Sequence, residues 1–157
     1  MANKFDEYLE KQDGKYIKIA LTSKSYKKIK QELDDKNTNC ELSTYGDALL
    51  KLALCEILFE ENVDNITEEK KEYESDEMLV KVIAKKYELL KYMRYDENDK
   101  NIPRNYEYEK GHNNSTHKFI ATTVEALLAA YYLDNNKDFN LIIDLVKKWK
   151  SWIENNR

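Results

Sequence analysis

Residues 43–60 read STYGDALLKLALCEILFE, and this stretch decides the kind of fold. Its apolar residues recur at three- and four-residue steps, which predicts a central α-helix that is buried over most of its circumference. The expected buried stripe consists of Leu42, Tyr45, Leu49, Leu52, Ala53 and Ile57, widened by Leu50, Leu54, Leu58 and Phe59. Gly46 costs such a helix about 1 kcal/mol relative to alanine. It indicates either the close approach of another backbone or a tolerated defect.

The rest of the chain also follows helical spacing, and no strand pattern competes with it. Further helices are expected at residues 4–11, after Thr22 and Ser23, at 64–74, from Ser75 onward, at 116–133 and at 139–153. One proline and three glycines in 157 residues suit an all-α fold. We expect residues 1–157 to form a single domain, with a core from about residue 14 to 152. Residues 94–115 are polar and irregular, which is typical of functional loops.

Charge and composition narrow the classes of function. The formal net charge is −4, so any binding of nucleic acid needs a local basic patch or metal ions. Cys40 and Cys55 lack a CxxC partner, which predicts free thiols in a reducing cytosol rather than a zinc site. No run of 18 apolar residues occurs and the N-terminus has no apolar signal core, so we expect a cytoplasmic protein without a membrane span.

Two acids stand in otherwise apolar helical sequence, Asp47 in TYGDALLKLAL and Glu125 in ATTVEALLAAYYL. Burying a carboxylate is costly unless it is paired or holds a metal ion. If the two helices pack together, both acids can converge on one cation, and Mg²⁺ prefers one or two carboxylates plus several waters. The alternative is that each acid lies on a solvated edge or pairs with a nearby lysine.

Several blocks of the sequence resemble the ribonuclease III family. Residues 39–50, NCELSTYGDALL, are similar to its signature N-E-[RK]-L-E-F-L-G-D-[AS]-[VL]-L. Residues 20–26 (ALTSKSY), 75–92 (SDEMLVKVIAKKYELLKY) and 118–134 (KFIATTVEALLAAYYLD) resemble other family blocks in the same order. The resemblance covers about residues 14–152. It implies a ribonuclease III endonuclease-domain-like helical bundle, usually a two-fold dimer, which cleaves double-stranded RNA with a metal-activated water and leaves 5′-phosphate and 3′-hydroxyl ends.

The same resemblance assigns roles to individual residues. Asp47 matches the metal ligand of the signature helix, and Glu125 matches the essential glutamate that binds catalytic Mg²⁺, with Mn²⁺ as the alternative ion. Both are therefore the expected catalytic and metal-binding residues. Lys118 matches a basic residue often found near the site.

Four positions depart from the family pattern. Ser43 and Thr122 stand where most members have acids, and Cys40 replaces the glutamate of the N-E pair. The site loses two negative charges, so we expect it to bind Mg²⁺ more weakly. A short subgroup called Mini-III, which lacks an appended RNA-binding domain, also has small or hydroxyl residues at positions 43 and 122. Thr44 replaces a phenylalanine that usually plugs into the partner subunit, which weakens one contact of the expected homodimer.

Contact with RNA would have to come from basic residues near the acids, since we expect no separate RNA-binding domain. The candidates flank the polar loop and are Lys100, Arg104, Lys110, His112, His117 and Lys118. A solvated loop with ordinary charges is the alternative. Residues 147–152, KKWKSW, mix cations and aromatics as nucleic-acid surfaces do, although helical spacing favours Trp149 and Trp152 as core anchors.

Two functions compete. The first is a metal-dependent endoribonuclease that cleaves double-stranded or structured RNA in RNA processing, and it is preferred because Asp47 and Glu125 are retained. The second is a catalytically impaired ribonuclease III-like dimer that binds RNA or a protein partner. It is motivated by the missing acids at Ser43 and Thr122.

Overall fold

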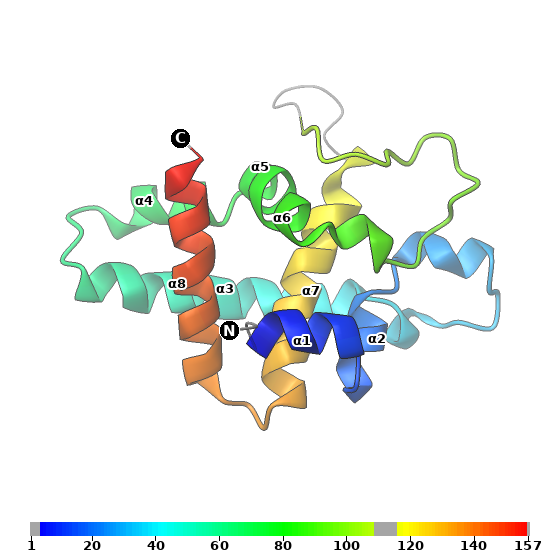
Figure 1. The fold of residues 1–157 in the computed structure, drawn as a ribbon, viewed down its shortest axis with the longest axis horizontal. Helices are drawn as coiled ribbons and strands as arrows, with labels where there is room; N and C mark the ends of the chain where they lie inside the picture. Colours follow the sequence, from blue (N-terminus) through cyan, green and yellow to red (C-terminus); the bar gives the residue numbers. More distant parts are fainter. Residues whose placement is uncertain (1–3, 109–115, 157) are drawn as a thin grey trace.

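The computed structural model describes residues 4–108 and 116–156. Within these ranges the chain is helical without a β-strand, which confirms the predicted fold class (Figure 1). The nearest approach to a strand in the described ranges is an isolated parallel bridge between Thr22 and Arg94. No helix in these ranges has both the length and the apolar character that crossing a membrane requires.

The main helices are α1 (Lys4–Lys11), α2 (Lys15–Ala20), α3 (Cys40–Glu60), α4 (Ile66–Tyr73), α5 (Asp76–Met78), α6 (Lys85–Tyr87), α7 (Lys118–Asp134) and α8 (Phe139–Asn155). Short 3₁₀ turns are η1 (Lys24–Lys28), η2 (Asp35–Asn37) and η4 (Leu89–Lys91), and a π-helical segment, η3 (Leu79–Ala84), joins α5 to α6. The sequence predicted a regular helix at η3. Five of the six residues of η3 are buried, whereas a regular α-helix at a protein surface buries the residues of one face only.

The prediction of an α-helix after Ser23 is wrong in both the type and the length of the helix. Ser23 caps a turn as predicted, since its side chain accepts a hydrogen bond from the Ser25 amide. The turn is the five-residue 3₁₀ helix η1, and Ile29 beyond it is 47% exposed. A five-residue turn followed by an exposed Ile29 has too little packing to extend into an α-helix.

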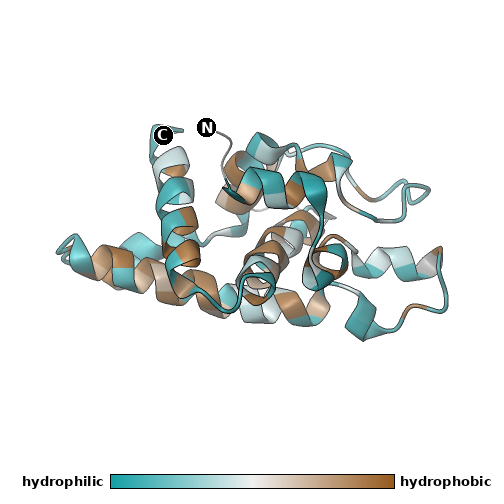
Figure 2. Cartoon of the chain, turned by 60° about the horizontal axis from the view of Figure 1, so that its bottom comes forward, coloured by the Kyte–Doolittle hydropathy of each residue, from teal (hydrophilic) through white to brown (hydrophobic). Residues whose placement is uncertain are grey.

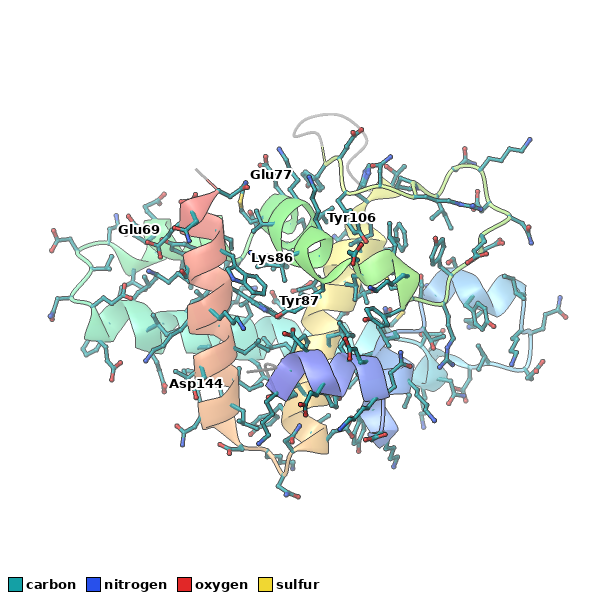
Figure 3. All side chains as sticks on the ribbon, viewed as in Figure 1. Glu69, Glu77, Lys86, Tyr87, Tyr106 and Asp144 are labelled. Atoms are coloured by element: carbon teal, nitrogen blue, oxygen red, sulfur yellow. The ribbon has the colours of Figure 1, made fainter. Side chains whose placement is uncertain are left out.

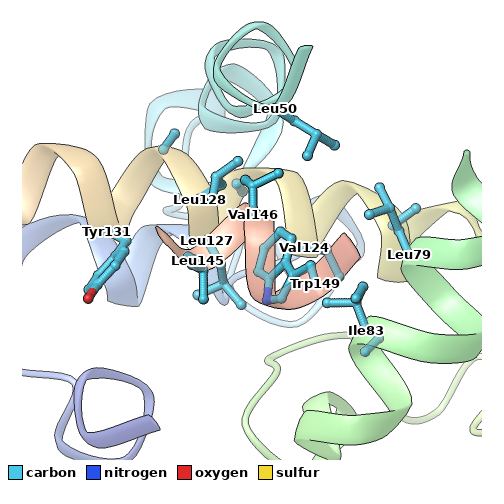
Figure 4. Close-up of a cluster of buried hydrophobic side chains, with 14 of the residues drawn as sticks. Leu50, Leu79, Ile83, Val124, Leu127, Leu128, Tyr131, Leu145, Val146 and Trp149 are labelled. Carbon is cyan, nitrogen blue, oxygen red and sulfur yellow. The ribbon is translucent and has the colours of Figure 1, made fainter. Parts of the chain in front are cut away.

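The core is built around α7, which packs against α2, α3, α8 and η3 (Figure 1). Hydrophobic residues run along both α3 and α7 (Figure 2), whereas the exposed Glu69 and Asp144 project outward from α4 and α8 (Figure 3). A close-up of the core shows side chains from several helices meeting beside α7 (Figure 4). Trp149 is a buried core anchor, as the helical spacing predicted, whereas Trp152 is only partly buried.

The apolar stripe predicted for α3 is only partly buried. Tyr45, Leu52 and Phe59 are 42%, 50% and 75% exposed, whereas the other members of the predicted stripe are buried. These three residues are spaced by seven and therefore lie along one line of the helix. The bundle covers the opposite side of α3, so the described chain leaves this line in solvent. We call Tyr45, Leu52 and Phe59 the α3 seam.

Two polar side chains, one partly buried and one buried, hold the N-terminal segments against the bundle. Asp134, at the end of α7, accepts hydrogen bonds from the Tyr8 hydroxyl at 2.6 Å and from the Tyr16 and Ile17 amides at 3.1 Å. It therefore caps α2 from a distant part of the chain. Asn39, just before α3, donates to the Ala20 carbonyl at 3.1 Å and to the Thr123 hydroxyl at 3.0 Å. The hydrogen bond with Thr123 links the start of α3 to α7.

Candidate functional site

Helices α3 and α7 touch backbone to backbone at Gly46. A β-carbon built on Gly46 would overlap the carbonyl group of Glu125. Of the two interpretations of this glycine, close approach of another backbone is therefore correct, because any side chain would push the helices apart. The crossing brings Asp47, the next residue in α3, beside Glu125 in α7.

The carboxyl groups of Asp47 and Glu125 share a hydrogen bond, which makes them an acid pair. Burial raises the pKa of Glu125 to about 8, and the hydrogen bond and charge of Asp47 act in the same direction. Burial also acts to raise the pKa of Asp47, but hydrogen bonds with Glu125 and Lys51 hold it below its ordinary value. Near neutral pH, Glu125 is therefore the protonated partner and donates to the Asp47 carboxylate.

Lys51, one turn after Asp47, supplies the nearest positive charge. Its Nζ lies 2.5 Å from Asp47 Oδ2, and the two side chains are 46% and 39% exposed. The charge of Lys51 also acts on Glu125. Both sequence interpretations thus hold in part, because the acids converge and one of them pairs with a lysine. A half-exposed pair of this kind contributes about 0–1 kcal/mol, so another cation can displace it.

A further acid near the pair was missed in the sequence. Asp76 begins α5, directly after its cap Ser75, and its charge adds to the raised pKa of Glu125. Its place after a capping serine gave no functional signal. Across residues 4–108 and 116–156, no group of three or more His, Cys, Asp or Glu side chains is arranged to hold a metal ion. The geometry therefore offers two adjacent carboxylates, with Asp76 acting at longer range.

The positions where the sequence departs from the family pattern border the acid pair. Ser43 lies four residues before Asp47 and Thr122 three residues before Glu125, so each shares a helix face with its acid. The Ser43 hydroxyl donates to the Cys40 carbonyl at 2.8 Å. Cys40 itself is a free, partly buried thiol at the start of α3. Hydroxyl groups thus occupy the helix faces on which the family pattern has acids.

The described basic residues that were predicted to contact RNA lie in the segment before α7 and at the start of α7. His117 bonds to Asn105 at 2.9 Å and packs against Tyr108, with ring centroids 6.4 Å apart, while burial lowers its pKa. Lys118 is exposed at the start of α7, about 10 Å along the helix from Glu125. Arg104 is exposed and donates to the Glu97 carbonyl. Lys110, like His112, lies outside the described residues.

With this geometry in view, comparisons with known proteins define the class. Residues 41–136 match the ribonuclease III domain family. The chain is 32% identical over 151 residues to Ribonuclease 3 of Natranaerobius thermophilus, an alignment that covers 92% of this chain. The chain therefore belongs to the ribonuclease III family. It spans about 60% of the length of that curated relative.

Solved structures agree on the fold. Two structures of the nuclease domain of ribonuclease III from Campylobacter jejuni each match with a TM-score of 0.67. One is 19% identical and covers 94% of both chains, and the other is 20% identical and covers 99% of this chain and 97% of that one. The first is described as flexible in a region involved in dimer formation.

Proposed function

We propose that this chain is a metal-dependent endoribonuclease that cleaves double-stranded or structured RNA, as in RNA processing, through Asp47 and Glu125. The observation that carries the proposal is the convergence of these two carboxyl groups where α3 and α7 cross at Gly46. The family membership adds the reaction class, hydrolysis of a phosphodiester bond.

The residues present fit a Mg²⁺ ion, with Mn²⁺ as the alternative. Mg²⁺ is commonly held by one or two carboxylates and retains several waters, and Asp47 and Glu125 supply two carboxylates. When bound, the ion lowers the pKa of its water and neutralises charge on a phosphate. Glu125 must lose its proton before both carboxylates can serve as ligands, and Lys51 competes with the ion for Asp47. With hydroxyls at Ser43 and Thr122 in place of acids, we expect weaker binding of the ion.

The α3 seam supports a homodimer as the assembly. Tyr45, Leu52 and Phe59 present an exposed apolar line on α3, and Ala48 and Cys55 between them are small. A second copy of the same helix can cover this line with knobs-into-holes packing. Thr44 lacks the bulk of the family phenylalanine, so the seam has to supply the apolar contact. Cys40 and Cys55 are free thiols, which suits a cytoplasmic protein.

Cleavage of a defined RNA duplex tests the proposal. Purified protein incubated with the duplex and Mg²⁺ should release fragments with 5′-phosphate and 3′-hydroxyl ends. Glu125→Gln and Asp47→Asn should reduce the rate by at least about a hundredfold, since each removes a metal ligand. Glu10→Gln, at an exposed acid of α1, is the matched control and should leave the rate unchanged. An inactive wild type, or a Glu125→Gln variant as active as the wild type, would contradict the proposed nuclease function.

The second candidate is a catalytically impaired dimer that binds RNA or a protein. The hydroxyls at Ser43 and Thr122 and the pairing of Asp47 with Lys51 favour it. The double variant Ser43→Glu, Thr122→Asp separates the two functions. A large gain in cleavage would mean that the natural site is impaired, whereas a small change would mean that Asp47 and Glu125 suffice.

A further inference from the structure

A basic groove follows the helix that runs from α5 through η3 to α6. One hollow lies between this helix and the end of α8 and includes Lys86 and Trp152. A second lies between the helix and residues 104–108. The two hollows share Lys81, Lys85 and Asn156, so they form one continuous surface. We call this surface the basic groove.

The charge of the groove is opposite to that of the chain. Its lining holds one acid, Glu107, and four cations, Lys81, Lys85, Lys86 and Arg104, although the net charge of the chain is −4. Lys81 pairs with Glu77 only at 3.4 Å, and neither Lys85 nor Lys86 forms an ion pair with a described residue. Lys81 and Lys85 are four residues apart on one helix, where like charges repel and reduce helix stability. An anionic ligand would relieve that repulsion.

Aromatic side chains set the shape of the groove. Lys86 Nζ lies 4.9 Å from the centre of the Trp152 ring, which in turn packs against Tyr87 at 5.2 Å. The Tyr106 hydroxyl accepts a hydrogen bond from the Leu90 amide at 2.9 Å and so holds its segment against the helix. Figure 3 labels Lys86 and Tyr87, which belong to α6, and Tyr106. The lysines therefore project from a packed surface rather than from a loose tail.

The helix that bears the groove packs against α7, which carries Glu125, through both α5 and η3. Asp76, at the start of the same helix, lies close enough to Glu125 for its charge to act there. Tyr108, at the near end of the groove, is likewise within reach of Asp76. Lys81 and Lys85 follow Asp76 by five and nine residues along this helical segment. The lysines and Glu125 therefore belong to neighbouring helices, which one extended polyanion can contact together.

We propose that the basic groove binds the phosphate backbone of the RNA on one side of the acid pair. This inference rests on the proposed nuclease function and adds a surface for substrate binding. Phosphate contacts fix the position of a duplex without reading its sequence, and lysines and asparagine amides are suitable donors. Lys81 and Lys85 supply the charge, and Asn156 supplies an amide between the two hollows.

Equilibrium binding of an RNA duplex without divalent metal tests the groove. The variant Lys81→Gln, Lys85→Gln is compared with Lys11→Gln, Lys71→Gln, which removes the same charge from exposed pairs with Glu7 and Glu68. Fluorescence anisotropy over a series of KCl concentrations should give a Kd roughly tenfold weaker for the groove variant. The slope of log Kd against log salt should fall by about one for each phosphate that the variant no longer neutralises. The control should bind as the wild type does.

The outcomes separate this inference from the nuclease proposal. Equal binding of RNA by the wild type, the groove variant and the control would contradict a role of the basic groove in RNA binding, whatever the cleavage rate. Absence of cleavage by RNA-bound wild type would overturn the nuclease alone. Should the double variant fail to fold by circular dichroism, Lys85→Gln alone, at an exposed residue, gives the same comparison.

Discussion

Gly46 in α3 lies directly against the backbone carbonyl of Glu125 in α7, with no room for a β-carbon between them. We expect Gly46→Ala to force the helices apart and to lower the free energy of unfolding by about 1–3 kcal/mol, the usual cost of overpacking, despite the better helix propensity of alanine. Urea denaturation measures this change. Thr44→Ala, at an exposed residue of the same helix, should not destabilise. A Gly46→Ala protein as stable as the wild type would mean that the crossing is looser than described.

Lys51 competes with any metal ion for Asp47, because its ammonium group already bonds that carboxylate. We expect Lys51→Ala to tighten the binding of Mn²⁺ by roughly threefold, in keeping with the modest strength of a half-exposed ion pair. Titration followed by electron paramagnetic resonance measures the affinity directly. Lys71→Ala removes the same charge from an exposed pair with Glu68 and should have no effect. Weaker binding in Lys51→Ala would show that the lysine supports the site instead.

The prediction of the acid pair from sequence had an identifiable basis. Two acids in otherwise apolar helical sequence suggested a shared site, and close approach of another backbone was one of two interpretations of Gly46. Lys51 could have been found as well, because residues four apart on a helix are neighbours. Asp76 could not, because its proximity depends on how the helix after Ser75 packs against α7.

The differences between the predicted and the observed α3 and η3 share one physical cause. Apolar spacing shows which residues can be buried, but it does not show how many partners surround a helix. For α3 the bundle covers one side, and Leu52 stays in solvent although it follows the spacing of buried residues. For η3 the burial is wider than a regular helix provides, and the backbone opens into a π-helical turn.

The raised pKa of Glu125 makes stability depend on pH. The folded protein holds this proton up to about pH 8, whereas the carboxyl has an ordinary pKa of 4.5. The folded state therefore binds more protons between these values, so the metal-free protein should lose stability as pH rises from about 4.5 to 8. Asp47 contributes in the opposite sense, through stability lost only below its ordinary pKa of 3.8.

Thermal unfolding in EDTA across this pH range tests the assignment. Glu125→Gln should remove this part of the pH dependence and be more stable than the wild type near pH 8, because glutamine has no proton to lose. Glu10→Gln, in exposed α1, should follow the wild-type curve. Parallel curves for Glu125→Gln and the wild type would show that another group is responsible.

The α3 seam leads to a prediction about assembly. Leu52 is 50% exposed and central in the line from Tyr45 to Phe59, so Leu52→Asp should place a charge inside the proposed dimer contact without disturbing the core of one subunit. Sedimentation velocity should then report a monomer where the wild type sediments as a dimer. Ile29→Asp is the matched control, since Ile29 is 47% exposed and lies outside the seam. A dimer that persists in Leu52→Asp, or that is lost equally in Ile29→Asp, would mean that the copies associate through another surface, because buried acids without partners are strongly unfavourable at the centre of an apolar interface.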